Sequence, residues 1–348
     1  MNPFLAAADP DELKAFCRDA GFPAFRASQI SSWLHGHYVT DPAAMKNLPG
    51  EVKQALAAHF IAPGASTVRI ASGTDGVEKL LLDLRDGERI EMVILPGGGR
   101  TTFCLSTQVG CPVGCLFCAS GRGGLIRNLA AGEMLEEFCI GALRAGRPDN
   151  LVFMGIGEGL LNFDALALAL SRLTGEFAFS PRRITVSTSG YVPGMKRFAS
   201  LKKEYNLAVS LHAPDDATRA RLIPARLRYP IAEILDAADM IREANNRQYT
   251  LEYTLVAGIN DSVDQAKALG RIACAHHAKV NLIPYNETGG VFRRPAAPVI
   301  DDFENAVASV GARVTRRVER GTGETAACGQ LRAAAKRDPS AVNQERKP

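Results

Sequence analysis

The chain has 348 residues, 46% of them hydrophobic, and a formal net charge of +4 at pH 7. This composition can bury a large core with a smaller domain attached, and the mild excess of base permits a nucleic-acid partner without demonstrating one. No apolar run is long enough to cross a bilayer, and the first residues lack the basic and apolar regions of a signal peptide. These features argue against a membrane span and against secretion, so we expect a cytoplasmic protein with no membrane partner.

The first 62 residues predict a small helical domain. Residues 9–21 begin with an aspartate that can cap a helix and end with a glycine that can stop it. Apolar residues recur at helical spacing in 27–39 and in 49–60. We therefore assign residues 1–62 to a helical accessory domain.

From about residue 66 the apolar pattern changes to that of strands. Residues 66–72, 77–87 and 89–99 predict a small antiparallel meander, with turns at Thr-Asp-Gly and Asp-Gly-Glu between them. We assign residues 63–103 to this β-meander, which leads into the core.

Beyond residue 104 buried strands alternate with amphipathic helices. Strands are expected at 150–158, 183–190, 206–213, 250–258, 279–286 and 313–321, and helices at 130–146, 163–175, 231–246, 264–276 and 303–311. This alternation predicts an α/β fold, a partial (β/α)6 barrel of the TIM type over 104–332, whose chemistry gathers at the carboxyl ends of the strands. Residues 333–348 are expected to form a disordered basic tail.

Four of the eight cysteines fall within residues 104–118, which read CLSTQVGCPVGCLFC. A reducing cytosol favours metal binding or catalysis over a disulfide scaffold. Cys111, Cys115 and Cys118 have the spacing C-x3-C-x2-C and follow an expected strand at 104–110. Turn-forming residues between them predict a loop.

Zinc ribbons and ferredoxin clusters take a fourth protein ligand, and this sequence has no second C-x2-C pair. Three thiolates leave one iron of a [4Fe–4S] cluster without a protein ligand, and a small chelating molecule can bind there. The remaining alternative is three buried, inert cysteines, which the tight spacing and the glycine-rich loop disfavour.

The C-x3-C-x2-C motif, with Phe117 before its last cysteine, resembles the signature of the radical S-adenosylmethionine (SAM) enzymes. The resemblance implies a [4Fe–4S] cluster on the three cysteines, whose open iron takes the amino and carboxylate groups of SAM. One electron from the cluster then cleaves SAM to a 5′-deoxyadenosyl radical. The superfamily also has the partial barrel that the strand pattern predicts.

Further motifs narrow this resemblance. CLSTQVGC, RNLAAGE, MGIGEGLLNFD, RRITVSTSG, SLHAPDD, KVNLIPYN and AACGQL occur in the order found in the RlmN/Cfr family, and the resemblance covers about residues 14 to 332. That family methylates an adenosine of 23S rRNA, and in RlmN also of certain tRNAs, at carbon 2 or carbon 8. The resemblance implies an RNA substrate and an accessory domain that binds RNA.

The resemblance assigns roles to the residues that match the family motifs. It implies three catalytic residues: Cys328, which is methylated on sulfur, the second cysteine Cys104, and the proton acceptor Glu91. The residues implied to contact SAM are Gly157, Glu158, Ser187, Ser210, Leu211, His212 and Asn286. On the predicted strand map these contacts fall at or near the carboxyl ends of four strands.

The route that the resemblance implies uses one cluster per chain and two molecules of SAM per turnover. Cys328 takes a methyl group from the first SAM by displacement. The radical from the second SAM removes hydrogen from that S-methyl group, and the resulting methylene radical adds to the adenine carbon. Glu91 removes a proton from the adduct or an early intermediate, and Cys104 attacks the sulfur of Cys328. This last step forms a disulfide and releases the methylated RNA.

Several of these residues also have a purely structural interpretation. Without the motif, Glu91 could be a solvent-exposed residue of a strand. Cys328 could be a buried thiol of the core, and Ser187 could simply end a strand. Arg127 has two interpretations of equal weight, a contact with RNA or ligand and a role in starting the following helix. The residues expected only to pack the two cores are Cys17, Cys139, Cys274, Trp33, His35 and His37.

Three segments depart from the family pattern. The family reads Gly-Glu-Pro where this chain has Gly157-Glu158-Gly159, and glycine loosens a turn that proline would fix. The loop before Cys328 is less acidic than in the family, with Glu324 as its acidic residue. Residues 285–298, YNETGGVFRRPAAP, also differ from the family's sequence at that place. Because these segments should lie beside the substrate, the motifs predict the chemistry but leave the RNA target, and carbon 2 or carbon 8, open.

Two other classes of function remain open from the residues. One is a radical SAM enzyme of another reaction class, which would not require Cys104 or Cys328; the other is a zinc-binding RNA module without activity. For the RNA methyltransferase we expect a monomer with an electron donor such as flavodoxin or ferredoxin. The candidates for phosphate contacts are Arg122, Arg127, Arg293 and Arg294.

Overall fold

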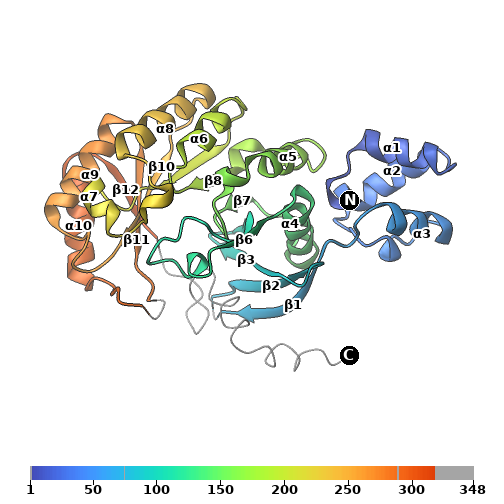
Figure 1. The fold of residues 1–348 in the computed structure, drawn as a ribbon, viewed down its shortest axis with the longest axis horizontal. Coiled ribbons are helices and arrows are strands. Elements are labelled where there is room, and N and C mark those ends of the chain that lie inside the picture. The colour runs from blue at the N-terminus through green and yellow to red at the C-terminus, as the bar shows by residue number, and fades with distance from the viewer. Residues whose placement is uncertain (1, 74, 288–289, 318–348) are drawn as a thin grey trace.

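The chain folds into a helical region and a mixed α/β region (Figure 1), described by a computed structural model over residues 2–73, 75–287 and 290–317. The predicted tail 333–348 and Cys328 lie outside the described residues. The predicted last strand, 313–321, also passes beyond them after Arg317.

The helical region has its own apolar core, which includes Leu13, Ile30 and Leu56. Its helices are α1 (Pro10–Asp19), α2 (Phe25–Ser31) and α3 (Gly50–His59), and a π-helical turn, Ser32–Gly36, extends α2. Asp9 caps α1, because its carboxylate accepts hydrogen bonds from the backbone N–H groups of Asp11 and Glu12. The helices predicted in this region are therefore confirmed.

One continuous sheet of ten strands dominates the rest of the described chain, in the order β1-β2-β3-β4-β7-β8-β9-β10-β11-β12. The strands of the meander and its continuation are β1 (Ala65–Ser72), β2 (Glu78–Leu84), β3 (Arg89–Gly97) and β4 (Arg100–Cys104). The strands that follow are β7 (Asn150–Phe153), β8 (Ile184–Thr188), β9 (Asn206–Ser210), β10 (Thr250–Leu255), β11 (Lys279–Pro284) and β12 (Arg313–Arg316). β1 to β4 pair antiparallel, and β4 to β12 pair parallel.

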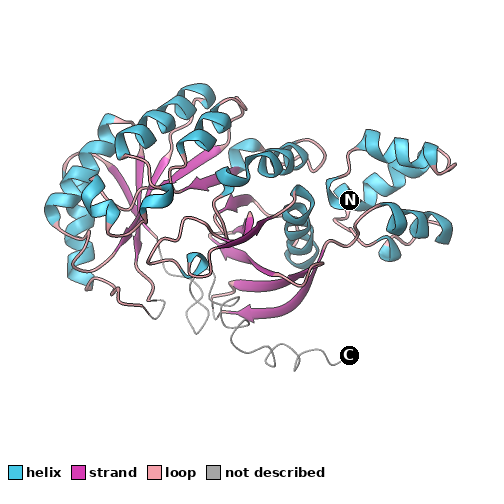
Figure 2. Cartoon of the chain, in the orientation of Figure 1, coloured by secondary structure: helices cyan, strands magenta, loops and turns pink. Residues whose placement is uncertain are grey.

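Helices cover the outer face of this sheet (Figure 2). They are α4 (Ala131–Ala145), α5 (Phe163–Thr174), α6 (Val192–Ala199), α8 (Ile231–Asn245), α9 (Val263–Ala275) and α10 (Ala297–Ser309), with the short α7 (Asp216–Ala220) between β9 and α8. Alternate strand residues such as Leu151, Phe153 and Tyr253 point into the core beneath them. The predicted α/β fold with a partial barrel is confirmed: the described sheet is open, with β1 and β12 at its edges.

Three details differ from the sequence prediction. A strand was predicted to begin at residue 104, but Cys104 is instead the last residue of β4. β4 joins the meander to the parallel part of the sheet, and with β4 this part has seven strands in the described chain. Several predicted strands end earlier, β7 at Phe153 and β9 at Ser210; just after β9, His212 takes a positive φ of 57° that leaves the β region. The short helices α6 and α7 escaped prediction, and α6 has proline and glycine at its second and third positions.

Candidate active site

The cysteine loop lies between the two strands of a small hairpin, β5 (Gln108–Gly110) and β6 (Leu125–Asn128). Gly110 has a φ of 85°, and a Cβ there would lie 2.0 Å from the carbonyl oxygen of Gly124. Only glycine fits this close approach. The hairpin therefore fixes the point at which the cysteine loop begins, and Cys111 directly follows β5.

The three thiols of the loop are half-buried in an apolar environment formed by Val113, Leu222 and Tyr285 among others. Burial raises the pKa of Cys111 to about 12 and the pKa of Cys115 further still. Without a metal the neutral thiols are thus favoured, and a metal that binds thiolates would reverse this preference.

The donor set fits an iron–sulfur cluster. The thiols of Cys111 and Cys118 both act electrostatically on that of Cys115, so the three lie near one another. No three metal-ligating side chains in the described chain converge as ligands of one ion do. In a [4Fe–4S] cluster each thiolate binds a different iron, so its ligands surround a cube. Cys111, Cys115 and Cys118 are therefore the residues that would hold the cluster.

The residues expected to contact SAM lie at the carboxyl ends of β7, β8, β9 and β11. Gly157 and Glu158 follow β7, Ser187 lies within β8, and Asn286 follows β11. Ser210 ends β9, and Leu211 and His212 follow it directly. Since parallel strands end at one edge of the sheet, the fold brings these distant motifs to the same edge.

Backbone contacts join the end of β7 to the segment before the cysteine loop. The backbone N–H of Glu158 donates to Oε1 of Gln108 at 2.8 Å, and a Cβ on Gly157 would lie 2.7 Å from the side chains of Gln108 and Thr107. The carboxylate of Glu158 is buried and accepts the backbone N–H of Ser189 at 2.6 Å. Burial raises the pKa of this carboxyl. The Gly-Glu motif thus connects β7, β8 and the cysteine-bearing segment.

His212 links the end of β9 to the cysteine loop. Its Nδ1 accepts the backbone N–H of Thr254 at 3.0 Å, and burial lowers the pKa of the ring to about 3. The imidazole is therefore neutral, and the hydrogen bond at Nδ1 assigns its proton to Nε2. The ring of Phe117 meets it edge-on, with 4.8 Å between the centroids.

Glu91 and Cys104 lie on the same, inner face of the sheet. Cys104 is directly opposite Val93 in the β3–β4 ladder, and Glu91 is two residues from Val93 on β3. Both side chains are buried, and the Ser106 hydroxyl donates to the Glu91 carbonyl at 2.7 Å. Burial raises the pKa of Cys104 to about 11, while the charges of Arg317 and Lys79 oppose this rise. The third expected catalytic residue, Cys328, lies outside the described residues.

The inner face also carries polar residues that the motifs did not indicate. Oε2 of Glu252 on β10 accepts a hydrogen bond from Asn281 on β11 at 2.7 Å, and Oδ1 of Asn281 lies 3.2 Å from the Thr315 hydroxyl on β12. The backbone carbonyl of Glu252 also accepts the N–H groups of Leu211 and His212. The alternation of polar Glu252 and Thr254 with three apolar residues in Thr250–Leu255 was the available signal.

The structure decides between the two interpretations of Arg127. Its guanidinium forms a two-bond ion pair with Glu133 in the first turn of α4, both bonds being 2.8 Å, and a third bond with Asp86. The hydrogen bonds to Glu133 raise the pKa of Arg127. Arg127 therefore fixes the start of α4, as one of the two interpretations predicts.

The other cysteines and the small aromatic group behave mostly as packing residues. Cys17 and Cys139 are buried, as predicted, whereas the prediction for Cys274 was wrong, because its side chain is exposed near the end of α9. The Trp33 indole donates to the side chain of Asn47 at 2.5 Å. The ring of His37 packs against Trp33, and the ring of His35 packs against Phe177. The contacts of Trp33 with Asn47 and His37 confirm packing within the helical region, whereas His35 packs against Phe177 of the α/β core.

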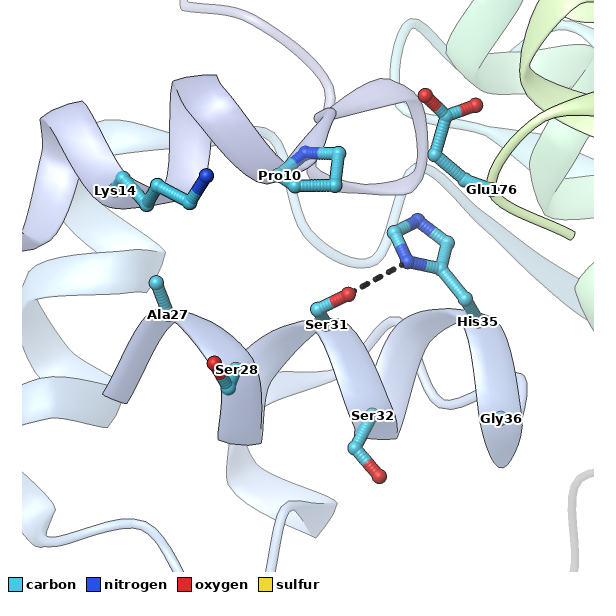
Figure 3. Close-up of a pocket in the computed structure, with 9 residues that line it drawn as sticks. All are labelled: Pro10, Lys14, Ala27, Ser28, Ser31, Ser32, His35, Gly36 and Glu176. Atoms are coloured by element: carbon cyan, nitrogen blue, oxygen red, sulfur yellow. Dashed lines mark hydrogen bonds between the residues drawn. The ribbon is translucent and has the colours of Figure 1, made fainter. Parts of the chain in front are cut away.

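A shallow cavity of about 450 Å³ lies far from this chemistry, between α1, α2 and the loop after α5 (Figure 3). Lys14, Ser28, Ser31, His35 and Glu176 are among its lining residues. Burial lowers the pKa of His35 to about 4, and its Nδ1 lies 3.0 Å from the Ser31 hydroxyl. Polar side chains of the helical region and of Glu176, which follows α5, line this cavity. None of the expected site residues lines it.

The fold and the cysteine loop together define the class of protein. Residues 105–268 match the Radical SAM superfamily, and residues 5–61 match the ribosomal RNA large subunit methyltransferase N-terminal domain. The crystal structure of a radical SAM methyltransferase from Sphaerobacter thermophilus has a TM-score of 0.89 and 40% identity, covering 94% of this chain and 98% of that one. No helix in the described part of the chain is long and apolar enough to span a membrane.

Curated relatives narrow this class to a family. The probable dual-specificity RNA methyltransferase RlmN of Akkermansia muciniphila is 40% identical over 342 residues, which cover 95% of each chain. The dual-specificity RNA methyltransferase RlmN of Geotalea uraniireducens is 40% identical over 92% of this chain and 94% of its own. The chain therefore belongs to the RlmN family of radical SAM methyltransferases. Membership implies SAM and a [4Fe–4S] cluster as its cofactors.

Proposed function

We propose that this protein methylates a ring carbon of adenosine, carbon 2 or carbon 8, in 23S rRNA, in tRNA or in both. The observation that carries the proposal is that the cysteine loop and the strand ends with the SAM motifs lie together at one end of the barrel. The cysteine loop contacts the strand ends that carry the SAM motifs, through Phe117 and His212, and Cys104 and Glu91 line the adjoining inner face. The whole-length likeness to RNA methyltransferases supports RNA as the substrate.

Each group of residues has a proposed task. Cys111, Cys115 and Cys118 hold one cluster per chain, which supplies the electron that opens SAM to radical chemistry. Gly157, Glu158, Ser187, Ser210, Leu211, His212 and Asn286 orient SAM at the strand ends. Cys328 carries the methyl group, Glu91 accepts the proton of the adenine carbon, and Cys104 closes a disulfide with Cys328 as the RNA leaves. Two molecules of SAM are used per turnover.

The buried position of Glu91 suits a proton acceptor better than a solvated strand residue. Its side chain is on the inner face, two residues along β3 from the partner of Cys104, and it is shielded from water. We further propose a monomer in the cytoplasm, reduced by a donor such as flavodoxin or ferredoxin.

The decisive experiment is nucleoside mass spectrometry. Protein reconstituted with iron and sulfide without oxygen is incubated with rRNA and tRNA fragments, SAM and a chemical reductant, and the RNA is digested and compared with 2-methyl- and 8-methyladenosine. We expect one of these two nucleosides with the native protein and neither with Cys118→Ala. Unimpaired turnover by Cys328→Ala would reject the S-methylcysteine route in favour of another radical SAM reaction.

The same preparation tests the zinc-binding alternative. A radical SAM protein is brown after reconstitution and holds about four irons per chain. A colourless protein with one zinc per chain would overturn the proposed function before any RNA is added.

A further inference from the structure

Arg219 in α7 is a fully buried arginine at the edge of the candidate active site, with 0% of its surface exposed. Its guanidinium donates to three backbone carbonyls: that of Ser189 after β8 at 2.5 Å, that of Leu211 after β9 at 3.1 Å, and that of Tyr229 before α8 at 3.2 Å. Two of these carbonyls belong to the strand ends where SAM is expected. The side chain therefore fixes the spacing between the ends of β8 and β9.

This buried cation lacks a carboxylate partner among the residues that the structure describes. All three of its hydrogen-bond acceptors are neutral carbonyls, and the nearby Asp216 carboxylate accepts the backbone N–H of Ile231 instead. Arginine is almost never fully buried without a counter-charge, because removing a charge from water costs much free energy. Burial lowers the pKa of Arg219 to about 10, which reflects this cost. The charge of Asp216 acts on Arg219, but no described carboxylate is hydrogen-bonded to it, so a further negative charge beside it would stabilise it.

The cysteine loop rests directly on the chain segment that follows Arg219. The backbone N–H of Leu116, in the middle of the loop, donates to the carbonyl of Leu222 at 3.0 Å. The N–H groups of Leu222 and Ile223 donate in turn to the carbonyl of Arg219, at 3.1 and 2.9 Å. The side chains of Leu222 and Ile223 belong to the apolar cluster that contacts Cys111 and Cys115.

The charges of Arg219 and of the loop also act on each other. Arg219 lies close enough to Cys115 for the charge of one group to act on the other. Cluster binding converts three thiols to thiolates and releases their protons. The loop is thus the nearby group whose negative charge appears when the cluster binds.

We propose, on the basis of the cluster assigned in the proposed function, that Arg219 is the buried counter-cation of Cys111, Cys115 and Cys118 and a positioning residue for their cluster. Its positive charge stabilises the thiolates and the reduced, more negative form of the cluster. Its three hydrogen bonds hold the ends of β8 and β9 at a fixed place beside the cysteine loop. The protein without its cluster is therefore electrostatically incomplete, and the cluster supplies the missing anion.

The test compares Arg219→Gln, which keeps donor groups but loses the charge, with Arg219→Lys, which keeps the charge. The matched control is Arg228→Gln, since Arg228 is half-buried in the same segment and donates to one carbonyl, that of Ile223, at 2.9 Å. Each variant is reconstituted without oxygen, and its cluster potential is measured by redox titration with electron paramagnetic resonance. Loss of iron to a chelator is followed in parallel, and thermal unfolding of the cluster-free forms reports folding.

We expect Arg219→Gln to shift the cluster potential to more negative values and to lose iron about tenfold faster, while Arg219→Lys and Arg228→Gln stay near the native protein. A native potential in folded Arg219→Gln overturns the inference. If the Gln variant does not fold, Arg219→Lys decides, and a shifted potential in its folded form overturns the inference. A native protein that binds no iron contradicts the proposed function itself, which is a separate result.

Discussion

Glu136 in α4 shows how strongly its surroundings decide what a charged side chain does. Its carboxylate is buried and accepts two hydrogen bonds of 2.8 Å, one from the Thr40 hydroxyl and one from the backbone N–H of Gly64. Burial raises its pKa to about 7, with a smaller contribution from Asp41. Thr40 lies in the helical region and Gly64 just before β1, so this one residue ties the two parts of the molecule together.

The raised pKa predicts that Glu136 makes the protein less stable as pH rises. Between the unfolded value of 4.5 and the folded value of about 7, the folded state keeps a proton that the unfolded state releases. This contribution is fully present at low pH and lost as pH rises through 7. When pH rises from 5 to 8, the free energy of unfolding of Glu136→Gln should therefore increase by roughly 2 kcal/mol relative to that of the native protein.

The measurement is chemical denaturation of both proteins at the two pH values. Glu51→Gln is the control, because Glu51 is exposed in the first turn of α3. An equal pH dependence in the native protein and Glu136→Gln would show that Glu136 is already ionised in the folded state at pH 5.

Arg317 should promote the reactivity of the Cys104 thiol. Along β12, Val314 packs against the core, Thr315 bonds to Asn281 on the inner face, and Arg316 pairs with Asp301 and Glu304 of α10. Alternation places Arg317 on the inner face, where its charge lowers the pKa of Cys104, as does that of Lys79, while burial and Glu137 raise it. Arg317→Gln should therefore slow alkylation of Cys104 at pH 8.

Arg316→Gln is the matched control for this experiment, because Arg316 is the neighbouring arginine but faces α10. Isotope-labelled iodoacetamide followed by peptide mass spectrometry reports each cysteine separately. Equal rates at Cys104 in the two variants would contradict the expectation, and the rate at exposed Cys274 should not change in either.

At the scale of elements, α4 is the surface on which the N-terminal segment docks. Phe4 lies against Gly132 in the first turn of α4, and a Cβ on that glycine would lie 2.1 Å from the Cβ of Phe4. Arg172 of α5 adds a second connection, since it donates to the carbonyl of Ala7 at 2.8 Å and pairs with Asp9 at 3.0 Å. The helical region is thus held by α4 and α5 together.

Gly132→Ala should destabilise the protein, although alanine normally favours a helix. The methyl group cannot fit against Phe4, so we expect a loss of about 1–3 kcal/mol in the free energy of unfolding. Gly50→Ala is the control, because no atom lies within 4 Å of a Cβ at that first position of α3. A stabilised Gly132→Ala, as helix propensity alone predicts, would mean that Phe4 does not hold this position.

At the scale of the whole molecule, exposed arginines gather at the edge of the barrel that carries the candidate site. Arg122 follows the cysteine loop, and Arg293 and Arg294 precede α10. The carbonyl of Arg293 accepts the backbone N–H of Ala257, which follows β10, at 2.9 Å. This location suits contacts with the phosphates of an RNA whose adenosine enters the barrel.

The affinity for RNA should therefore fall steeply with salt. Replacing both Arg293 and Arg294 by glutamine should reduce the slope of log K against log salt by roughly 1.5, because each phosphate contact contributes about 0.7 to 0.9. The control is Arg182→Gln, because Arg182 precedes β8 at the opposite edge of the sheet and pairs with Glu204 at 2.7 Å. Filter binding at several salt concentrations measures the slopes, and an unchanged slope in the double variant would place the RNA elsewhere.

Features that depend only on residues close together in the chain could be predicted from the sequence. The spacing of Cys111, Cys115 and Cys118, the Asp9 helix cap and the alternation of strands and helices are local patterns, so the α/β partial barrel and the cysteine loop were predictable. Local helix and strand signals also placed the SAM motifs near the carboxyl ends of strands, because parallel strands joined by helices must all end at one edge.

Which distant residues meet became clear from the folded chain alone. It joined the meander and the barrel into one sheet through β4, exposed Cys274, placed Glu252 beside Asn281, and buried Arg219 against three carbonyls with the cysteine loop above it. Burial, pKa and pairing depend on atoms that are far apart in the chain and close in space. No local period encodes such contacts, and for that reason the charge partners of this site could be read only from the folded molecule.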